Sequence, residues 1–312
     1  MFQFIKQRMK GAQNISQITK AMELVAATKM RRSQEIALRS RPYAYAALDL
    51  LRTLATLEET DKTPPLLQKR LPARTAVVLV TSDKGLAGSF NSSVLRRFDQ
   101  FAKKEGVTPQ NQNYLFVAVG KKAHAHLEKQ GFAVLESFVR AGDYTTPDQV
   151  SPIASVLERQ YVAGAIDRAI VFSTHFRTAL TQEVIEREIL PIEPAALTDL
   201  INEIVPETGR FSELRIENSE LSKEAPKSFL IEPTPERVLG AIASHLLHMQ
   251  VYHLFMEANA SEHAARRMAM KNASENATEL VQTLTITYNK LRQAAITKEI
   301  TEIVAGAEAL KN

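Results

Sequence analysis

The hydrophobic positions of the first 58 residues follow the spacing of a helix that packs along one side. The segment holds one Gly and one Pro, and most other positions are good helix formers. Its apolar positions step by three, four and three residues, as in a coiled-coil seam: Ile15, Ile18, Met22 and Val25. Pro42 lies inside the pattern and predicts a kink near residues 40–41.

The C-terminal region predicts a second and longer helix. At Thr234-Pro235-Glu236, Thr suits the cap, Pro the first turn and Glu the positive end of a helix. No proline follows, so residues 236–310 predict an uninterrupted helix about 110 Å long, at about 1.5 Å per residue. Its apolar stripe consists of Ile242, Leu246, Met249, His253, Met256 and Ala260, and further on of Ala273, Ala277, Leu280, Leu284, Thr287 and Leu291.

A helix of this length needs a partner along much of its course. The N-terminal helix is the other long one, so we expect the two to form an antiparallel two-helix coiled coil. The C-terminal helix would then extend beyond its partner by roughly 30 Å. An apolar stripe on this overhang predicts a surrounding protein sleeve: Ile296, Ile300, Ile303, Val304, Ala307 and Leu310.

The middle of the chain alternates between short apolar runs and helical patterns. Strands are predicted at residues 76–80, 114–119, 133–139 and 169–173, and helices at 93–104, 121–130 and 148–165. This alternation predicts an α/β, Rossmann-like domain with a mainly parallel sheet, to which residues 180–192 could add an edge hairpin. The predicted organisation is an N-terminal helix (1–58), a linker with three prolines (59–73), the α/β domain (74–232) and a C-terminal helix (233–312).

Composition and charge exclude some classes of function. The chain has no Cys, which excludes disulfides, thiolate metal sites and a Cys nucleophile. No run approaches the roughly 18 apolar residues that span a bilayer, so we expect no direct membrane insertion. Residues 1–41 carry nine basic and two acidic side chains, which indicates either an acidic partner or a solvated helix face. Nucleic-acid binding is disfavoured because no aromatic residues are interleaved with the basic ones.

The candidate chemistry is sparse. The loop Ser82–Asn91 follows a strand and precedes a helix, where phosphate-binding loops lie, but its Gly and Lys spacing fits neither common phosphate-loop motif. We therefore interpret it as a tight turn in which glycines supply positive φ. His245 and His248 could share a metal by spacing, but no carboxylate accompanies them on that face. No catalytic residues, cofactor site or metal site are predicted.

Four stretches strongly resemble the gamma subunits of ATP synthases. The N-terminal one, Gln13–Arg32, reads QNISQITKAMELVAATKMRR, and the C-terminal one, Tyr288–Ala307, reads YNKLRQAAITKEITEIVAGA. The stretches Ala258–Ala277 and Ser82–Asn91 also match. The resemblance covers the whole chain in order, except that residues 193–228 match least well.

The resemblance implies the central rotating stalk of an F-type, proton-translocating ATP synthase. In that family the terminal helices form a coiled coil inside a ring of three alpha and three beta subunits. The α/β domain is the foot, which meets the epsilon subunit and the membrane c-ring. Ion flow turns the stalk, and the stalk drives the beta sites through their states. Catalysis belongs to beta, so the resemblance implies a non-catalytic subunit without a cofactor.

Individual positions also match the family. Four correspond to positions that contact beta: Met22, Arg292, Gln293 and Thr297. Four basic positions form a flank expected to face acidic segments of beta: Lys20, Lys29, Arg31 and Arg32. Two departures stand out, since the absence of Cys excludes the thiol regulation of chloroplast-type members, and Gln17 replaces a basic residue that many members have.

One alternative stays open at this point: a nucleotide-binding α/β enzyme with a coiled-coil dimerisation arm. It predicts a phosphate site at Gly85–Gly88 and self-association. For the location, the absence of a recognisable presequence leads us to expect the cytoplasmic face of a bacterial plasma membrane, with an organellar inner membrane as the second option.

Overall fold

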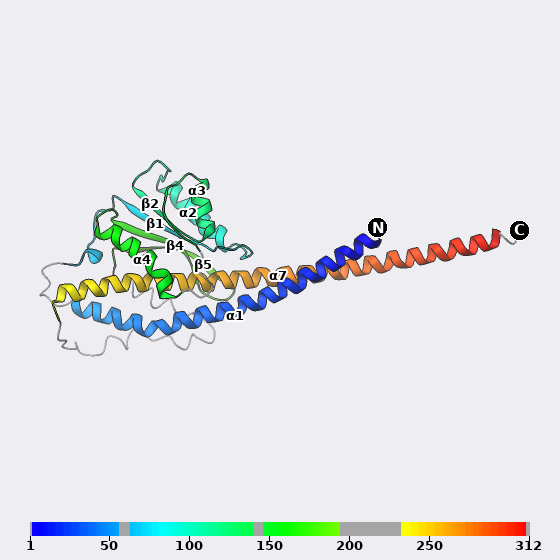
Figure 1. Cartoon of the computed structure of the whole chain (residues 1–312), viewed down its shortest axis with the longest axis horizontal. Coiled ribbons are helices and arrows are strands. Elements are labelled where there is room, and N and C mark those ends of the chain that lie inside the picture. Colours follow the sequence, from blue (N-terminus) through cyan, green and yellow to red (C-terminus); the bar gives the residue numbers. More distant parts are fainter. Residues whose placement is uncertain (1, 56–62, 140–145, 194–231, 310–312) are drawn as a thin grey trace. The chain divides into compact units, whose positions relative to one another are not determined.

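The computed structural model describes residues 2–55, 63–139, 146–193 and 232–309. The chain forms two compact units, which we call the terminal unit (residues 1–26 and 266–312) and the central unit (residues 27–265). Figure 1 shows the elements of both units. Two long helices, α1 (Phe2–Ala55) and α7 (Pro235–Ala309), contribute residues to each of them.

A five-stranded sheet in the order β3-β2-β1-β4-β5 forms the centre of the central unit. Four strands run parallel: β1 (Thr75–Val80), β2 (Tyr114–Val119), β3 (Val134–Phe138) and β4 (Arg168–Phe176). At one edge, β5 (Gln182–Leu190) pairs with β4 in the antiparallel direction. The predicted α/β class with a mainly parallel sheet is confirmed, and the stretch at 180–192 supplies the edge strand.

Helices cover both faces of this sheet (Figure 1). One face packs against α2 (Phe90–Lys104) and α3 (Lys121–Lys129), and the other against α4 (Pro147–Val162) and α7. Because side chains alternate along a strand, Val77 and Leu79 enter the first core while Val78 enters the second. Both faces being covered explains why β1 is apolar at nearly every position.

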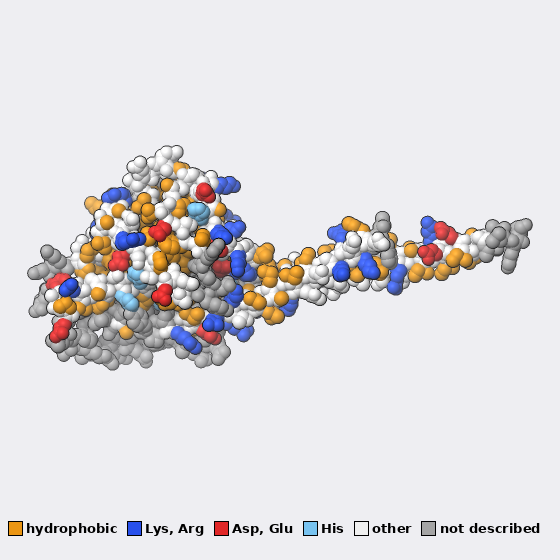
Figure 2. Space-filling view, viewed as in Figure 1, with side chains coloured by type: hydrophobic (Ala, Val, Ile, Leu, Met, Phe, Trp, Pro, Cys, Tyr) orange, Lys and Arg blue, Asp and Glu red, His pale blue; other side chains and the backbone are white. Residues whose placement is uncertain are grey.

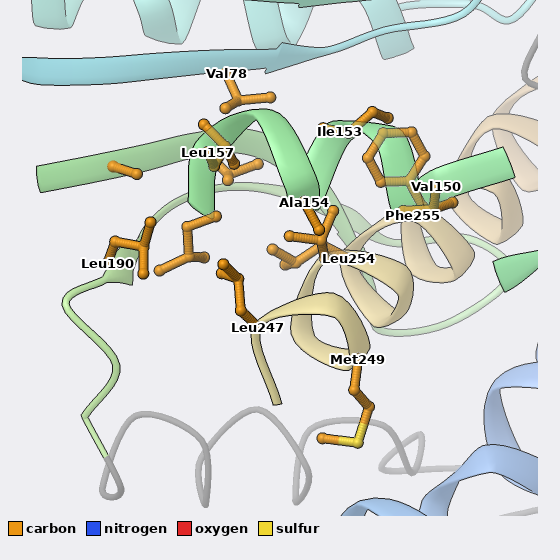
Figure 3. Packing of buried hydrophobic residues seen from close by; sticks show 14 of the residues in the cluster. Val78, Val150, Ile153, Ala154, Leu157, Leu190, Leu247, Met249, Leu254 and Phe255 are labelled. Carbon is orange, nitrogen blue, oxygen red and sulfur yellow. The ribbon is translucent and has the colours of Figure 1, made fainter. Parts of the chain in front are cut away.

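The core between α4, α7 and the sheet is built from aliphatic side chains. Figure 3 shows Ala154 and Leu157 of α4 beside Leu247 and Leu254 of α7, with Val78 above them. All five side chains are buried. On the opposite face, aromatic rings pack edge to face around Phe98, for example Phe172 at a centroid distance of 6.0 Å. The linker contains a short 3-10 helix (Pro65–Leu67), and its Leu66 is buried in the core on the α4 side of the sheet.

Both long helices lie where the sequence predicts them. Helix α1 spans 54 residues and continues without interruption through Pro42, where the sequence predicts a kink. Helix α7 spans 75 residues. At its start, the Thr234 hydroxyl accepts a hydrogen bond from the Arg237 backbone N–H at 3.4 Å, which confirms Thr234 as the cap.

In the terminal unit the two helices pair in antiparallel fashion. The Ser16 Oγ lies 3.0 Å from the Thr278 Oγ1, and the Ser274 hydroxyl donates to the Ser16 carbonyl at 3.3 Å. Nearer the N-terminus, Met9 meets Thr285. Residue numbers therefore rise on one helix as they fall on the other, as predicted.

The predicted seam of α1, however, is wrong at Ile15, Ile18 and Val25, which are exposed. Met22 is only half-buried. The buried face has the predicted heptad spacing but a different phase, and its members are small or polar: Ala12, Thr19, Glu23 and Ala26. Small side chains let the two backbones approach closely enough for the hydroxyl contacts between them, which a row of isoleucines would prevent.

The stripe of α7 is confirmed in the central unit and partly wrong in the terminal unit. In the former its predicted members are buried or half-buried: Ile242, Leu246, Met249, His253, Met256 and Ala260. In the latter Ala277 is buried, whereas Leu280 and Thr287 are exposed. Ala273, Leu284 and Leu291 are half-buried, and Met270 and Ser274 are buried in the same stretch, so this part of the seam combines large and small side chains.

Candidate functional site

The candidate residues of the terminal unit lie at two levels of the helix pair. The Ser16–Thr278 contact sets the register, in which Met22 of α1 lies near residue 272 of α7. Arg292, Gln293 and Thr297 of α7 follow about 20 residues later, or about 30 Å along the helix. The structure therefore does not bring Met22 and these three residues into one cluster.

Arg292, Gln293 and Thr297 are all exposed. In the antiparallel register the first residues of α1 lie opposite Arg292 of α7. Beyond this level, α7 has no α1 residues beside it. Arg292 can form a two-pronged contact with a carboxylate, while Gln293 and Thr297 offer neutral hydrogen-bonding groups. All three groups are available to another protein.

The end of α7 carries an exposed apolar face. Ile296, Ile300 and Ile303 are 48%, 56% and 71% exposed, and Val304 is 57% exposed. Their spacing of three and four residues places them on one side of the helix, while Lys298 and Glu302 pair with each other at 3.6 Å. We call these four residues the tip face. Such a run of large apolar side chains is typical of a protein contact surface.

A second exposed apolar surface lies beside the seam. Ile15, Ile18 and Val25 of α1 are exposed, and Leu280 of α7 is exposed near Ile15 in the antiparallel register. We call these four residues the flanking strip. Figure 2 shows hydrophobic side chains interspersed with basic ones along the helical part of the molecule.

The four basic candidates are divided between the units. In the terminal unit, Lys20 is exposed and pairs with the buried Glu23 at 3.0 Å. Lys29, Arg31 and Arg32 belong to the central unit, where Arg31 and Arg32 are exposed and Lys29 is half-buried. Their arrangement leaves several cationic groups at the surface of α1.

The loop between β1 and α2 uses its polar groups to fold. The Asn91 Oδ1 accepts the Ser82 backbone N–H at 2.9 Å, and the Asp83 Oδ1 accepts the Lys121 N–H at the start of α3 at 3.0 Å. The Thr81 hydroxyl accepts the Ala123 N–H at 2.8 Å. These bonds commit Asn91, Asp83 and Thr81 to holding the loop and the start of α3 in place.

The turn itself depends on left-handed backbone positions. Gly88 has φ 57°, as its residue type suggests, but the other left-handed position of the loop is Leu86 with φ 62°. Gly85 does not have positive φ, so only half of the predicted use of glycine is correct. Leu86 is thus in a conformation that a leucine rarely adopts, within a loop whose ends are joined by hydrogen bonds between Ser82 and Asn91.

The histidines link elements to each other. The His248 Nδ1 lies 3.3 Å from the Ser151 Oγ, and its Nε2 lies 3.3 Å from a Glu158 carboxylate oxygen, which joins α7 to α4. On the other face, the His126 Nε2 lies 2.8 Å from the Asp99 Oδ1, which joins α3 to α2. Within the described part of the chain, no three metal-ligating side chains are grouped in a way that could hold an ion.

A pocket of about 460 Å³ opens between α4 and α7 in the central unit. Its described lining is mostly apolar, with Ser151, Ser244 and His248 among its polar members, and Asp148 is the one carboxylate. Neither Lys nor Arg is among these lining residues, and none of them belongs to the Ser82–Asn91 loop. The described lining therefore offers no Lys or Arg to a nucleotide phosphate.

Sequence reasoning missed one polar cluster. The His175 Nδ1 of β4 lies 3.0 Å from the Glu257 Oε2 of α7, and both residues are buried. Ser173 and Gln250 are buried nearby in sequence on the same two elements, and burial lowers the pKa of His253 to about 4. In the sequence, the one sign of this cluster is that polar residues interrupt the apolar patterns of both β4 and α7.

The comparisons with known proteins agree along the whole chain. The family model for ATP synthase matches residues 2–310. The ATP synthase gamma chain of Synechococcus elongatus is 36% identical over 310 residues, covering 98% of each chain. The gamma chain of Chlorobaculum tepidum is 33% identical over 308 residues, again covering 98% of each. The chain belongs to the ATP synthase gamma chain family.

Solved structures show the same fold for this gamma chain family member. A chain from the central stalk and c-ring structure of the Tetrahymena thermophila mitochondrial ATP synthase is 25% identical, with a TM-score of 0.56, and the match covers 82% of this chain and 99% of that one. A chain of the Euglena gracilis mitochondrial ATP synthase gives a TM-score of 0.62 at 18% identity, covering 99% and 94%. The family and the fold together assign the chain the central-stalk role in an F-type ATP synthase. Among the described helices, none combines the length and apolar composition needed to cross a membrane.

Proposed function

We propose that this chain is a non-catalytic rotor whose terminal unit transmits torque to the beta subunits. The observation that carries the proposal is the tip face of α7, which extends past the start of α1 and leaves its isoleucines exposed. Complete burial of a large apolar side chain is favourable by roughly 1.5–3 kcal/mol relative to full exposure to water, and the tip face has four such side chains. A ring of alpha and beta subunits around this unit supplies that burial.

The contacts to beta are assigned to Arg292, Gln293 and Thr297 at one level and to Met22 at the other. All are on the surface of the terminal unit and are half-buried or exposed. One charge-assisted hydrogen bond from Arg292 can form at one rotary angle and break at the next, which suits stepwise transmission of torque.

The basic residues Lys20, Lys29, Arg31 and Arg32 are assigned to contacts with acidic segments of beta. Exposed charges interact weakly and over a range of angles, because water and salt screen them within about 8–10 Å. Such contacts favour the ring around α1 without fixing one orientation of the rotor.

The α/β domain of residues 74–232 is assigned to the foot, which would meet the epsilon subunit and the c-ring, with three alpha and three beta subunits completing the upper assembly. We keep the domain limits of 58, 73 and 232 as part of this proposal. The complex would be peripheral to the membrane, on the cytoplasmic face if the source is a bacterium. Proton flow through the c-ring would then turn the chain.

Co-expression with the alpha and beta subunits of the same organism tests this proposal. We expect a stable complex that hydrolyses ATP, and little assembly when α7 is truncated before Arg292. Failure of the full chain to assemble with alpha and beta would contradict the rotor function.

The alternative of a nucleotide-binding enzyme is disfavoured by the loop between β1 and α2. Asp83 caps α3, and Asn91 and Ser82 bond to each other, so the groups near the proposed Gly85–Gly88 phosphate site are committed to the fold. Isothermal titration of the isolated chain with ATP and Mg²⁺ separates the two. The rotor predicts no binding, whereas the enzyme requires saturable binding.

A further inference from the structure

Helix α7 is held by two different kinds of seam. In the central unit its buried positions include Leu246, Leu254 and Phe255. In the described part of the terminal unit the buried positions of α7 are Arg266, Met270, Ser274 and Ala277, and those of α1 are Ala12, Thr19, Glu23 and Ala26, so Met270 is the one large apolar side chain among them. Burial of apolar area is the main stabilising contribution to helix pairing, and small side chains contribute little of it.

The polar contacts across the terminal seam do not make up the difference. The Ser16 Oγ lies 3.0 Å from the Thr278 Oγ1, and the Ser274 hydroxyl donates a hydrogen bond to the Ser16 carbonyl. These hydroxyls exchange hydrogen bonds with water for hydrogen bonds with each other, so their net contribution is small. Glu23 is buried in the seam and pairs with Lys20 of the same helix, so this ion pair does not link α1 to α7.

Several large apolar side chains of the same two helices lie outside the seam. Ile15, Ile18 and Val25 of α1 and Leu280 and Ile286 of α7 are exposed. Closing the seam therefore leaves them in water, and only a further protein can bury them. A groove of about 780 Å³, lined by Gln17, Leu24 and Glu279 among others, runs along the same pair.

We propose that the two helices of the terminal unit pair only weakly in the free chain, and that they separate and re-pair while the central unit stays folded. Local opening of this kind occurs where few apolar contacts hold an element. In the complex, and this part rests on the proposed function, alpha and beta subunits that cover the flanking strip and the tip face hold the pair closed. The seam sets the register through its hydroxyls, and the surrounding proteins supply the stability.

Hydrogen exchange of the isolated full-length chain, read by mass spectrometry, tests the proposal without any partner. We expect peptides from residues 9–26 and 270–291 to exchange at least about 100-fold faster than peptides covering β1 and α4. Equal protection of the two units would overturn the proposal. Because no partner is present, this outcome is independent of whether the chain assembles with alpha and beta.

A seam variant and a matched control sharpen the test. Glu23→Leu places an apolar side chain in the seam and should slow exchange in the terminal unit about tenfold, with no change in β1. Glu279→Leu removes the same kind of side chain from an exposed position of α7 and should leave exchange unchanged. Equal effects of the two substitutions would contradict the assignment of weak pairing to the seam.

A disulfide keeps the proposal testable if Glu23→Leu does not fold. The chain has no native Cys, and the hydroxyls of Ser16 and Thr278 are close enough for cysteines at these positions to bond. The doubly substituted chain, Ser16→Cys with Thr278→Cys, should exchange about tenfold more slowly in the terminal unit when oxidised than when reduced. Identical exchange in both forms would show that the pair is already closed and would overturn the proposal.

Discussion

The His175 imidazole and the Glu257 carboxylate lie 3.0 Å apart and connect β4 to α7 inside the central unit. Both residues are buried, so removing one partner leaves a polar or charged group without its counterpart in a medium of low polarity. We predict that Glu257→Ala lowers the free energy of unfolding by about 3 kcal/mol. Urea unfolding followed by circular dichroism measures it.

The control for this prediction is Glu183→Ala, which removes a partly exposed carboxylate that pairs with Arg177 at the surface. Surface pairs contribute about 0–1 kcal/mol, so this variant should unfold close to the unmodified chain. A loss for Glu257→Ala no larger than that of Glu183→Ala would show that the buried pair contributes little.

Protonation of His253 should make the fold less stable in acid. Burial lowers its pKa from 6.5 to about 4, so the unfolded chain takes up this proton at higher pH than the folded chain. The free energy of unfolding should therefore fall as the pH drops from about 7 to about 4, by roughly 3 kcal/mol from this residue. Below that range both states are protonated and the effect is constant.

Thermal unfolding at pH 7 and pH 4.5 tests the role of His253. His253→Met places a flexible apolar side chain in the core, and this side chain cannot be protonated. The variant should lose a clearly smaller part of its stability between the two pH values. An unchanged pH dependence would assign the acid sensitivity to other groups.

Gly120 is constrained by its backbone and by its neighbour. Its φ is +85°, and a Cβ at this position would lie 2.2 Å from the Thr81 carbonyl oxygen. We predict that Gly120→Ala destabilises the chain by about 3 kcal/mol, measured by urea unfolding. Gly164 has φ +68° with no atom near its missing Cβ, so Gly164→Ala should cost only about 1 kcal/mol. Equal costs would mean that Thr81 yields to the added methyl group.

Arg292 should matter for turnover rather than for folding. It is exposed on α7, so Arg292→Ala should leave the melting temperature of the isolated chain unchanged. In the complex with alpha and beta, loss of one charge-assisted hydrogen bond of about 1.5 kcal/mol should slow ATP hydrolysis by up to about tenfold. Lys290→Ala, also exposed and two residues earlier, is the control. Equal rates for both variants would remove Arg292 from the proposed contacts.

The sequence predicts the secondary structure and the fold class well because both depend on local patterns. The run at residues 114–119 matches β2 without error, and Thr234 is the helix cap that its position indicates. The loop after β1 is a tight turn as expected, but the sequence could not show that Leu86 would share the left-handed conformation with Gly88. The loop is closed by hydrogen bonds between Ser82 and Asn91, which lie nine residues apart and are not visible as a local pattern.

The phase of the coiled coil is the main error of the sequence analysis, and its cause is physical. A hydrophobicity pattern selects Ile15, Ile18 and Val25 because it assumes that large apolar residues face the nearest helix. In this chain small residues such as Ala12 and Ala26 face it instead, and the large ones point outward. A single chain does not reveal partners that bury its outward face. The sites Met22, Arg292, Gln293 and Thr297 came from the family resemblance, and they remain predictions.

Rotation of a single complex tests the central claim most directly. A cysteine at the exposed Lys103 is the chain's only one, so a bead can be attached there while the alpha and beta subunits are fixed to a surface. We predict stepwise rotation of the bead in one direction when ATP is added, and none without ATP. A complex that hydrolyses ATP at full rate while the bead stays still would contradict the rotor function.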